Sequence, residues 1–187
     1  MNVTHSTVYL HCAEPGGVRY ESQHNMDNPL DAKQIPIDTP LFKAMTAFFA
    51  DDGWPFIQLE GRPMLTMNFE GKNARWACFA QARDEQTQFV FYSLCPVNAP
   101  EDRRAAMAEF LTRANYGLIV GNFEMDFEDG EIRYKTSVDF EGLPLAPAAF
   151  RTAVYANVSM MDQYFPGLMS ILHSTVSPRE MIDQIEG

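Results

Sequence analysis

The chain has 187 residues, enough for one domain with a modest extra segment, and 46% of them are hydrophobic, which excludes wholesale disorder. Its net charge of −11, with only 14 Lys and Arg residues, excludes nucleic acid as an expected partner, because phosphate binding needs clustered cations. Apolar runs are too short to span a membrane and the N-terminus lacks a secretory pattern, so we expect a cytoplasmic protein without a membrane partner.

Residues 1–37 differ in composition from the rest of the chain. A strand-like stretch at residues 3–11 precedes polar sequence that contains Pro and Gly. We predict an N-terminal arm or linker over 1–37, which could add one edge strand to a sheet. An α+β domain over 38–187, with additional C-terminal helices, is expected to follow it.

The domain begins with a predicted helix and continues with a predicted strand meander. Thr39 can cap the helix, Pro40 suits its first position and Gly53 suits its end. Alternating residues and turn signals then predict antiparallel strands at 56–60, 64–70, 74–83 and 88–95.

A second predicted helix opens at Pro100 and closes at residues 115–117. A β-hairpin follows, turning at Asp129-Gly130. One of its faces is apolar, and on the other face acids of the first strand oppose bases of the second. The apolar face of the first strand comprises Phe123, Met125 and Phe127.

The C-terminal third is predicted to be helical. A helix starts at Pro147, and Pro166-Gly167 is expected to break it before a short continuation. Ser177 and Glu180 form a capping-box pattern that opens a last short helix.

Patterns that would carry catalysis or bind a cofactor or metal are missing from the sequence. Acids cluster around the hairpin, but their spacing is not that of a calcium loop, and a solvated sheet face explains them better. Sequence neighbours such as Asp51 and Asp52 do not face one another on a helix, and His173 has no acid at a readable spacing. Arginines at 75, 103, 104 and 113 are better explained as salt-bridge partners than as an anion site. We therefore expect no enzyme, no cofactor and no metal.

Three cysteines occur without any CxxC spacing, so neither a zinc site nor a redox motif is indicated. Cys78 and Cys95 lie within predicted strands, where free thiols behave as small hydrophobic side chains. A reducing compartment suits this cysteine usage.

One positive signal for function is an excess of large apolar side chains. They lie on both faces of the predicted strands at 74–83 and 88–95 and along the long C-terminal helix. Two explanations remain open: the chain's own helices and arm cover this surface, or it is an interface for a second copy or a partner segment. The predicted interaction surface comprises Trp76, Phe79, Phe89, Phe91, Tyr92, Phe150, Val154, Val158, Met161 and Phe165.

The order helix, meander, helix, hairpin, helix resembles the YbjN family of bacterial sensory transduction regulators. The middle stretch carries the resemblance: the helix at 101–114 leads through Asn115-Tyr116-Gly117 to a strand entered at Gly121-Asn122 and continued as Phe123-Glu124-Met125-Asp126. The likeness spans about residues 38–165, and the class I chaperones of type III secretion systems are more distantly similar. It implies a curved antiparallel sheet with helices packed on one face, commonly as a dimer.

Two functions are therefore expected. The first is a non-catalytic protein-binding or chaperone-like regulatory module that forms a homodimer. The alternative is a sensor that binds a small molecule between sheet and helices, near Trp76, Phe91 and Phe110.

Overall fold

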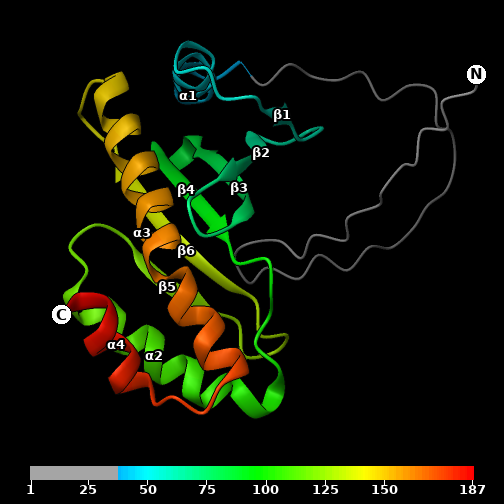
Figure 1. The fold of residues 1–187 in the computed structure, drawn as a ribbon. Helices are drawn as coiled ribbons and strands as arrows, with labels where there is room; N and C mark the ends of the chain where they lie inside the picture. The colour runs from blue at the N-terminus through cyan, green and yellow to red at the C-terminus, as the bar shows by residue number, and fades with distance from the viewer. Residues whose placement is uncertain (1–37) are drawn as a thin grey trace, which may run out of the picture. The chain divides into compact units, whose positions relative to one another are not determined.

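The computed structural model describes residues 38–187, and the predicted arm at 1–37 lies outside the described residues (Figure 1). The described part is an open antiparallel sheet with helices, which confirms the predicted α+β fold class. Its strand order is β1-β2-β3-β4-β6-β5. The strands are β1 (Ile57–Gln58), β2 (Met64–Glu70), β3 (Arg75–Arg83), β4 (Gln88–Leu94), β5 (Asn122–Met125) and β6 (Ile132–Asp139); the helices are α1 (Pro40–Asp51), α2 (Arg104–Gly117), α3 (Pro147–His173) and α4 (Pro178–Glu186).

Helix α1 begins and ends where the sequence predicts. Pro40 occupies its first turn, and Gly53 follows its end with a φ of +76°, a backbone conformation that glycine adopts without strain. Its buried stripe includes Met45, Phe48 and Phe49. Thr39 occupies the N-cap position as expected, but its side chain makes no capping hydrogen bond.

Helices α1, α2 and α3 pack against one face of the sheet, and α4 packs on α2 and α3. Large side chains of α1, α2 and α3 meet the inward residues of β3, β4 and β6 in a single hydrophobic core. Phe49 stacks on Phe91 with ring centroids 6.0 Å apart, and Phe150 meets the edge of Phe89 at 4.9 Å. No helix among residues 38–187 is long and apolar enough to cross a membrane.

The predicted hairpin is present, with β5 and β6 paired from Asn122↔Lys135 to Met125↔Ile132. Glu124 receives a hydrogen bond of 2.9 Å from Nε of Arg133, so the acid-to-base pairing across the strands is confirmed. The apolar face is shorter than predicted, however. Strand β5 ends at Met125 because Asp126 accepts backbone hydrogen bonds that close the turn, and Phe127 is left 62% exposed.

The predicted break at Pro166-Gly167 is wrong, because α3 runs without interruption from Pro147 to His173. Proline lacks the N–H that would bond the carbonyl four residues earlier, which here belongs to Asp162. That carbonyl oxygen instead accepts a hydrogen bond of 2.9 Å from Nδ2 of Asn73, in the β2–β3 turn. The Asp162 carboxylate in turn accepts the backbone N–H groups of Lys72 and Asn73. Since this turn satisfies the orphaned carbonyl, the helix can continue.

Cys78 and Cys95 are buried free thiols, as predicted. Burial raises the pKa of Cys78 to about 12 and that of Cys95 to about 11, so both stay protonated and unreactive near neutral pH. In a Cys12→Ser background, we expect neither thiol to react with Ellman's reagent at pH 8 until denaturant is added. Rapid labelling of the native protein would contradict this burial.

Candidate functional site

Most of the predicted interaction residues lie inside the core of their own chain. Seven of them are at most 2% exposed and pack between the sheet and the helices. The half-buried Phe165 packs against the same core. The seven buried residues are Trp76, Phe89, Phe91, Phe150, Val154, Val158 and Met161.

Phe79 and Tyr92, the other two, lie on the opposite face of the sheet. They form a second cluster with Met64 and Val90, built from β2, β3 and β4 without any helical residue. Arg133 lies over the Tyr92 ring at 4.9 Å and is fixed there by Glu124. Burial alone would raise the pKa of Glu124, but hydrogen bonds from Lys135 and Arg133 outweigh it and lower that pKa. The ion pairs of Glu124 with Arg133 and Lys135 therefore lie at the edge of this apolar cluster.

The two most exposed large apolar side chains of the described residues, Tyr116 and Ile119, lie in the last turn of α2 and in the loop that leads from it to β5. Tyr116 is 96% exposed, Ile119 is 97% exposed and Val120 is 44% exposed. Isolated apolar side chains are common on protein surfaces, but three within five residues form a patch of the kind that marks an interaction site.

Hydrogen bonds fix the C-terminal end of this segment, residues 116–120, which we call the apolar loop. Asn115 accepts the N–H of Phe123 at 2.7 Å and donates to the carbonyl oxygen of the same residue at 3.0 Å. The side chain of Asn115 thus occupies the outer edge of β5, where a further strand would otherwise pair. The Tyr134 hydroxyl donates to the carbonyl oxygen of Val120, and Gly121 makes the turn into β5 with a φ of +81°.

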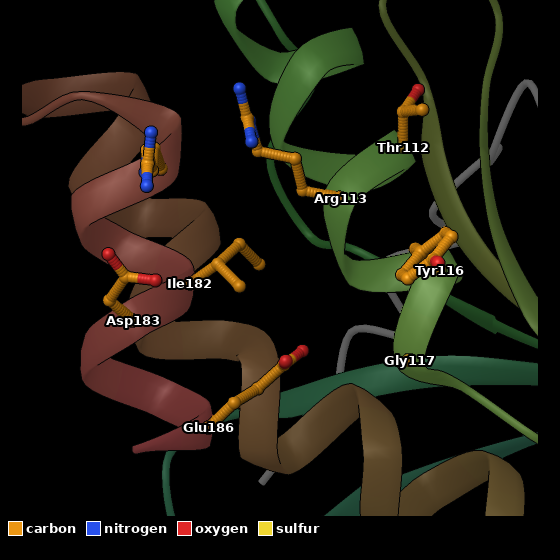
Figure 2. Close-up of a pocket in the computed structure, with 8 residues that line it drawn as sticks. Thr112, Arg113, Tyr116, Gly117, Ile182, Asp183 and Glu186 are labelled. Carbon is orange, nitrogen blue, oxygen red and sulfur yellow. The ribbon is translucent and has the colours of Figure 1, made fainter.

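A cleft of about 450 Å³ opens beside the apolar loop, between α2 and α4 (Figure 2). Its walls are Arg113, Tyr116 and Gly117 of α2 and Ile182, Asp183 and Glu186 of α4. Figure 2 shows Ile182 projecting from α4 toward α2. Two charged side chains that line the cleft already have partners. Arg113 pairs with Glu109 at 2.8 Å, and the Glu186 carboxylate accepts a hydrogen bond from the Tyr164 hydroxyl at 2.6 Å.

This cleft does not coincide with the ligand site that the sensor hypothesis predicted. That hypothesis placed a small molecule between sheet and helices, near Trp76, Phe91 and Phe110. Those three side chains are at most 2% exposed and belong to the packed core.

Several of the polar groups considered in the sequence analysis have structural partners. Within residues 38–187, no group of His, Cys, Asp or Glu is arranged to hold a metal ion. Asp52, which sequence reasoning set aside, binds Nε1 of Trp54 at 3.2 Å, the Tyr155 hydroxyl at 2.8 Å and the guanidinium of Arg151. It therefore ties α1 to α3. Among the grouped arginines, Arg104 donates to backbone carbonyl oxygens and Arg113 pairs with Glu109.

Sequence reasoning missed the exposed loop. It interpreted residues 115–117 as a helix end and Gly121 as the start of a strand, and it assigned no role to the residues between them. The available signal was the adjacent pair Ile119-Val120, two β-branched apolar residues flanked by Gly117 and Gly121 in a connection where polar residues are usual.

An open antiparallel sheet with its helices on one face defines a class of small α+β domain. Within that class, a family model described as "putative bacterial sensory transduction regulator" matches residues 42–169. The chain therefore belongs to the YbjN family, as the sequence resemblance predicted. No curated protein matches the sequence.

Three solved structures are similar to part of this chain. Escherichia coli YbjN, described as a putative transcription regulator, has a TM-score of 0.51 at 9% identity, and the similarity covers 67% of this chain and 92% of that protein. The HopA1–SchA chaperone–effector complex contains a chain with a TM-score of 0.42 at 16% identity, covering 65% and 91%. One chain of the ExsC–ExsE complex has a TM-score of 0.43 at 12% identity, covering 66% and 90%. At these identities the similarity concerns the fold alone.

Proposed function

We propose that this chain is a non-catalytic protein-binding module and that the apolar loop at 116–120 is its main contact surface. The single observation that carries the proposal is the exposure of Tyr116 and Ile119, two large apolar side chains beside a cleft. Exposed aromatic and aliphatic side chains cost solubility, and at the centre of an interface they supply most of the binding energy. The regulator description of the family is consistent with a binding role.

The geometry of the loop supports this role. Because Asn115 and Tyr134 fix its C-terminal end by hydrogen bonds, little conformational freedom should be lost when a partner binds. We further propose that a second copy of the chain is one partner, giving the homodimer expected from the sequence. Phe79 and Tyr92 are each only 7% exposed, so the proposed contact surface does not include them.

Ile119→Asp is expected to weaken partner binding roughly ten-fold or more, because a carboxylate would be desolvated at the contact. The measurement uses the full chain as bait in an extract of the source cell, followed by calorimetric titration of each retained protein after purification. Sedimentation equilibrium of the same variant tests the homodimer, which should dissociate at concentrations where the wild type is dimeric.

Ile57→Asp is the matched control. Ile57 is 70% exposed and lies on β1, at the opposite edge of the sheet from β5. This control should bind every partner as the wild type does. Equal affinity of the wild type and Ile119→Asp for all retained proteins, with an unchanged oligomeric state, would exclude the apolar loop as the contact surface.

A further inference from the structure

Strand β5 forms one edge of the sheet and β1 forms the other. The outward N–H and C=O groups of an edge strand can pair with a strand of another chain, and folded proteins limit this pairing with very short edge strands or with proline. Strand β1 has two residues and closely follows Pro55. Strand β5 has four residues and contains no proline, so its edge depends on another form of protection.

The side chain of Asn115 provides this protection at Phe123. Its Oδ1 accepts the backbone N–H of Phe123 at 2.7 Å, and its Nδ2 donates to the carbonyl oxygen of the same residue at 3.0 Å. A residue of a neighbouring antiparallel strand makes the same two bonds in a hydrogen-bonded pair. The amide of Asn115 therefore takes the place of one residue of a seventh strand.

The double contact does more than tie α2 to the sheet. One hydrogen bond would join Asn115 to β5, whereas bonding both groups leaves Phe123 without a donor or an acceptor for an incoming strand. The Phe123 side chain is 3% exposed and meets the Tyr134 ring at 4.7 Å, so the core holds this part of the edge in place. Without Asn115, β5 would present a fixed, unpaired edge.

We propose that Asn115 closes the β5 edge against a second copy of the chain. Two β5 strands brought together antiparallel by a two-fold axis, with one Phe123 opposite the other, would form the same pair of hydrogen bonds that Asn115 now provides. This closure is separate from the proposed function, because the apolar loop offers side chains to a partner whereas the β5 edge offers backbone groups.

The test places Asn115→Ala in the full chain carrying Ile119→Asp, so that contact through the apolar loop is already weakened. Sedimentation equilibrium should show a self-association Kd roughly ten-fold or more below that of Ile119→Asp alone, because the backbone groups of Phe123 become available in both copies. Adding Met125→Pro should restore the higher Kd. Alternate residues face the same edge, so Met125 points outward with Phe123, and proline there removes an N–H that a second strand would use.

Asn73→Ala is the matched control. It removes an amide that donates to a backbone carbonyl oxygen, that of Asp162 at 2.9 Å, but it lies in the β2–β3 turn and leaves β5 unchanged. Self-association should not change in this variant. Asn115→Ser, whose single hydroxyl cannot bond both groups of Phe123, is the second variant if Asn115→Ala does not fold, and it should associate in the same way.

Hydrogen exchange at the Phe123 amide gives a direct second measurement. In Asn115→Ala this N–H has lost its acceptor, so its exchange should slow roughly ten-fold as the protein concentration rises above the Kd, whereas the wild type should be protected at every concentration. Unchanged self-association in the Asn115 variants, association that survives Met125→Pro, or Phe123 exchange that is independent of concentration would each overturn the proposal. Wild-type partner binding and dimerisation by Ile119→Asp alone would instead exclude the apolar loop and leave the edge closure standing.

Discussion

Asn157→Asp should lower the free energy of unfolding by about 3–5 kcal/mol near neutral pH, because it places an acid where the fold requires a hydrogen-bond donor. Asn157 is fully buried on α3. Its Nδ2 donates to the carbonyl oxygens of Phe91 at 3.0 Å and Tyr134 at 3.1 Å, and to Oγ1 of Thr136 at 3.2 Å. An aspartate would direct a carboxylate at these three oxygens, with no donor to replace the amide.

The loss of stability should depend on pH in a defined direction. Burial and the facing oxygens raise the pKa of the new carboxyl above its unfolded value of about 3.9. The folded variant therefore binds the proton more tightly than the unfolded chain does. The destabilisation is complete above the raised pKa and diminishes as the pH falls toward about 4. Urea unfolding of both proteins at pH 7 and pH 5 measures this difference.

Asn68→Asp provides the matched control, since Asn68 is an exposed residue of β2. The same chemical change there should alter stability by less than about 0.5 kcal/mol at either pH. If Asn157→Asp were no more destabilising than this control, the hydrogen bonds that anchor α3 on β4 and β6 would not contribute to stability as argued.

The sequence was sufficient for elements whose signal is local. The hairpin strands alternate with period two, and their opposed charges, Glu124 and Arg133, pair in the structure as predicted. Continuity of α3 through Pro166 could not be predicted, because the donor that satisfies the freed carbonyl of Asp162 is Asn73, 89 residues away. Local propensity shows where a helix is weakened but not which distant residue compensates.

The same limit applies to the candidate site. Val154 and Met161 were correctly recognised as an apolar stripe, yet whether such a stripe faces the chain's own sheet or a partner depends on tertiary packing. Tyr116 and Ile119 are exposed beside a contact that no periodicity reveals, the hydrogen bonds between the side chain of Asn115 and the backbone of Phe123. The sequence pattern thus identified the apolar residues, and only the tertiary packing distinguished those in the core from those on the surface.

Gly130→Ala is the second substitution with a large expected effect, a loss of about 3 kcal/mol or more in the free energy of unfolding. Gly130 has a φ of +78° at the turn between β5 and β6. A Cβ there would lie 2.0 Å from the backbone oxygen of Ala99, whose N–H donates to the Gly130 carbonyl oxygen at 2.8 Å. The substitution must therefore separate the hairpin from the segment that leads into α2.

Gly142→Ala separates the two causes of this loss. Gly142 has a similar φ of +69°, but a Cβ there would meet no atom within 4 Å. Backbone strain alone should cost about 1 kcal/mol at that position, so the excess at Gly130 measures the steric contact with Ala99. Thermal and urea unfolding of both variants provide the comparison. Equal losses of stability in the two variants would mean that the hairpin shifts easily away from Ala99. A hairpin that shifts in this way could not hold β5 and the end of the apolar loop in a fixed position relative to α2.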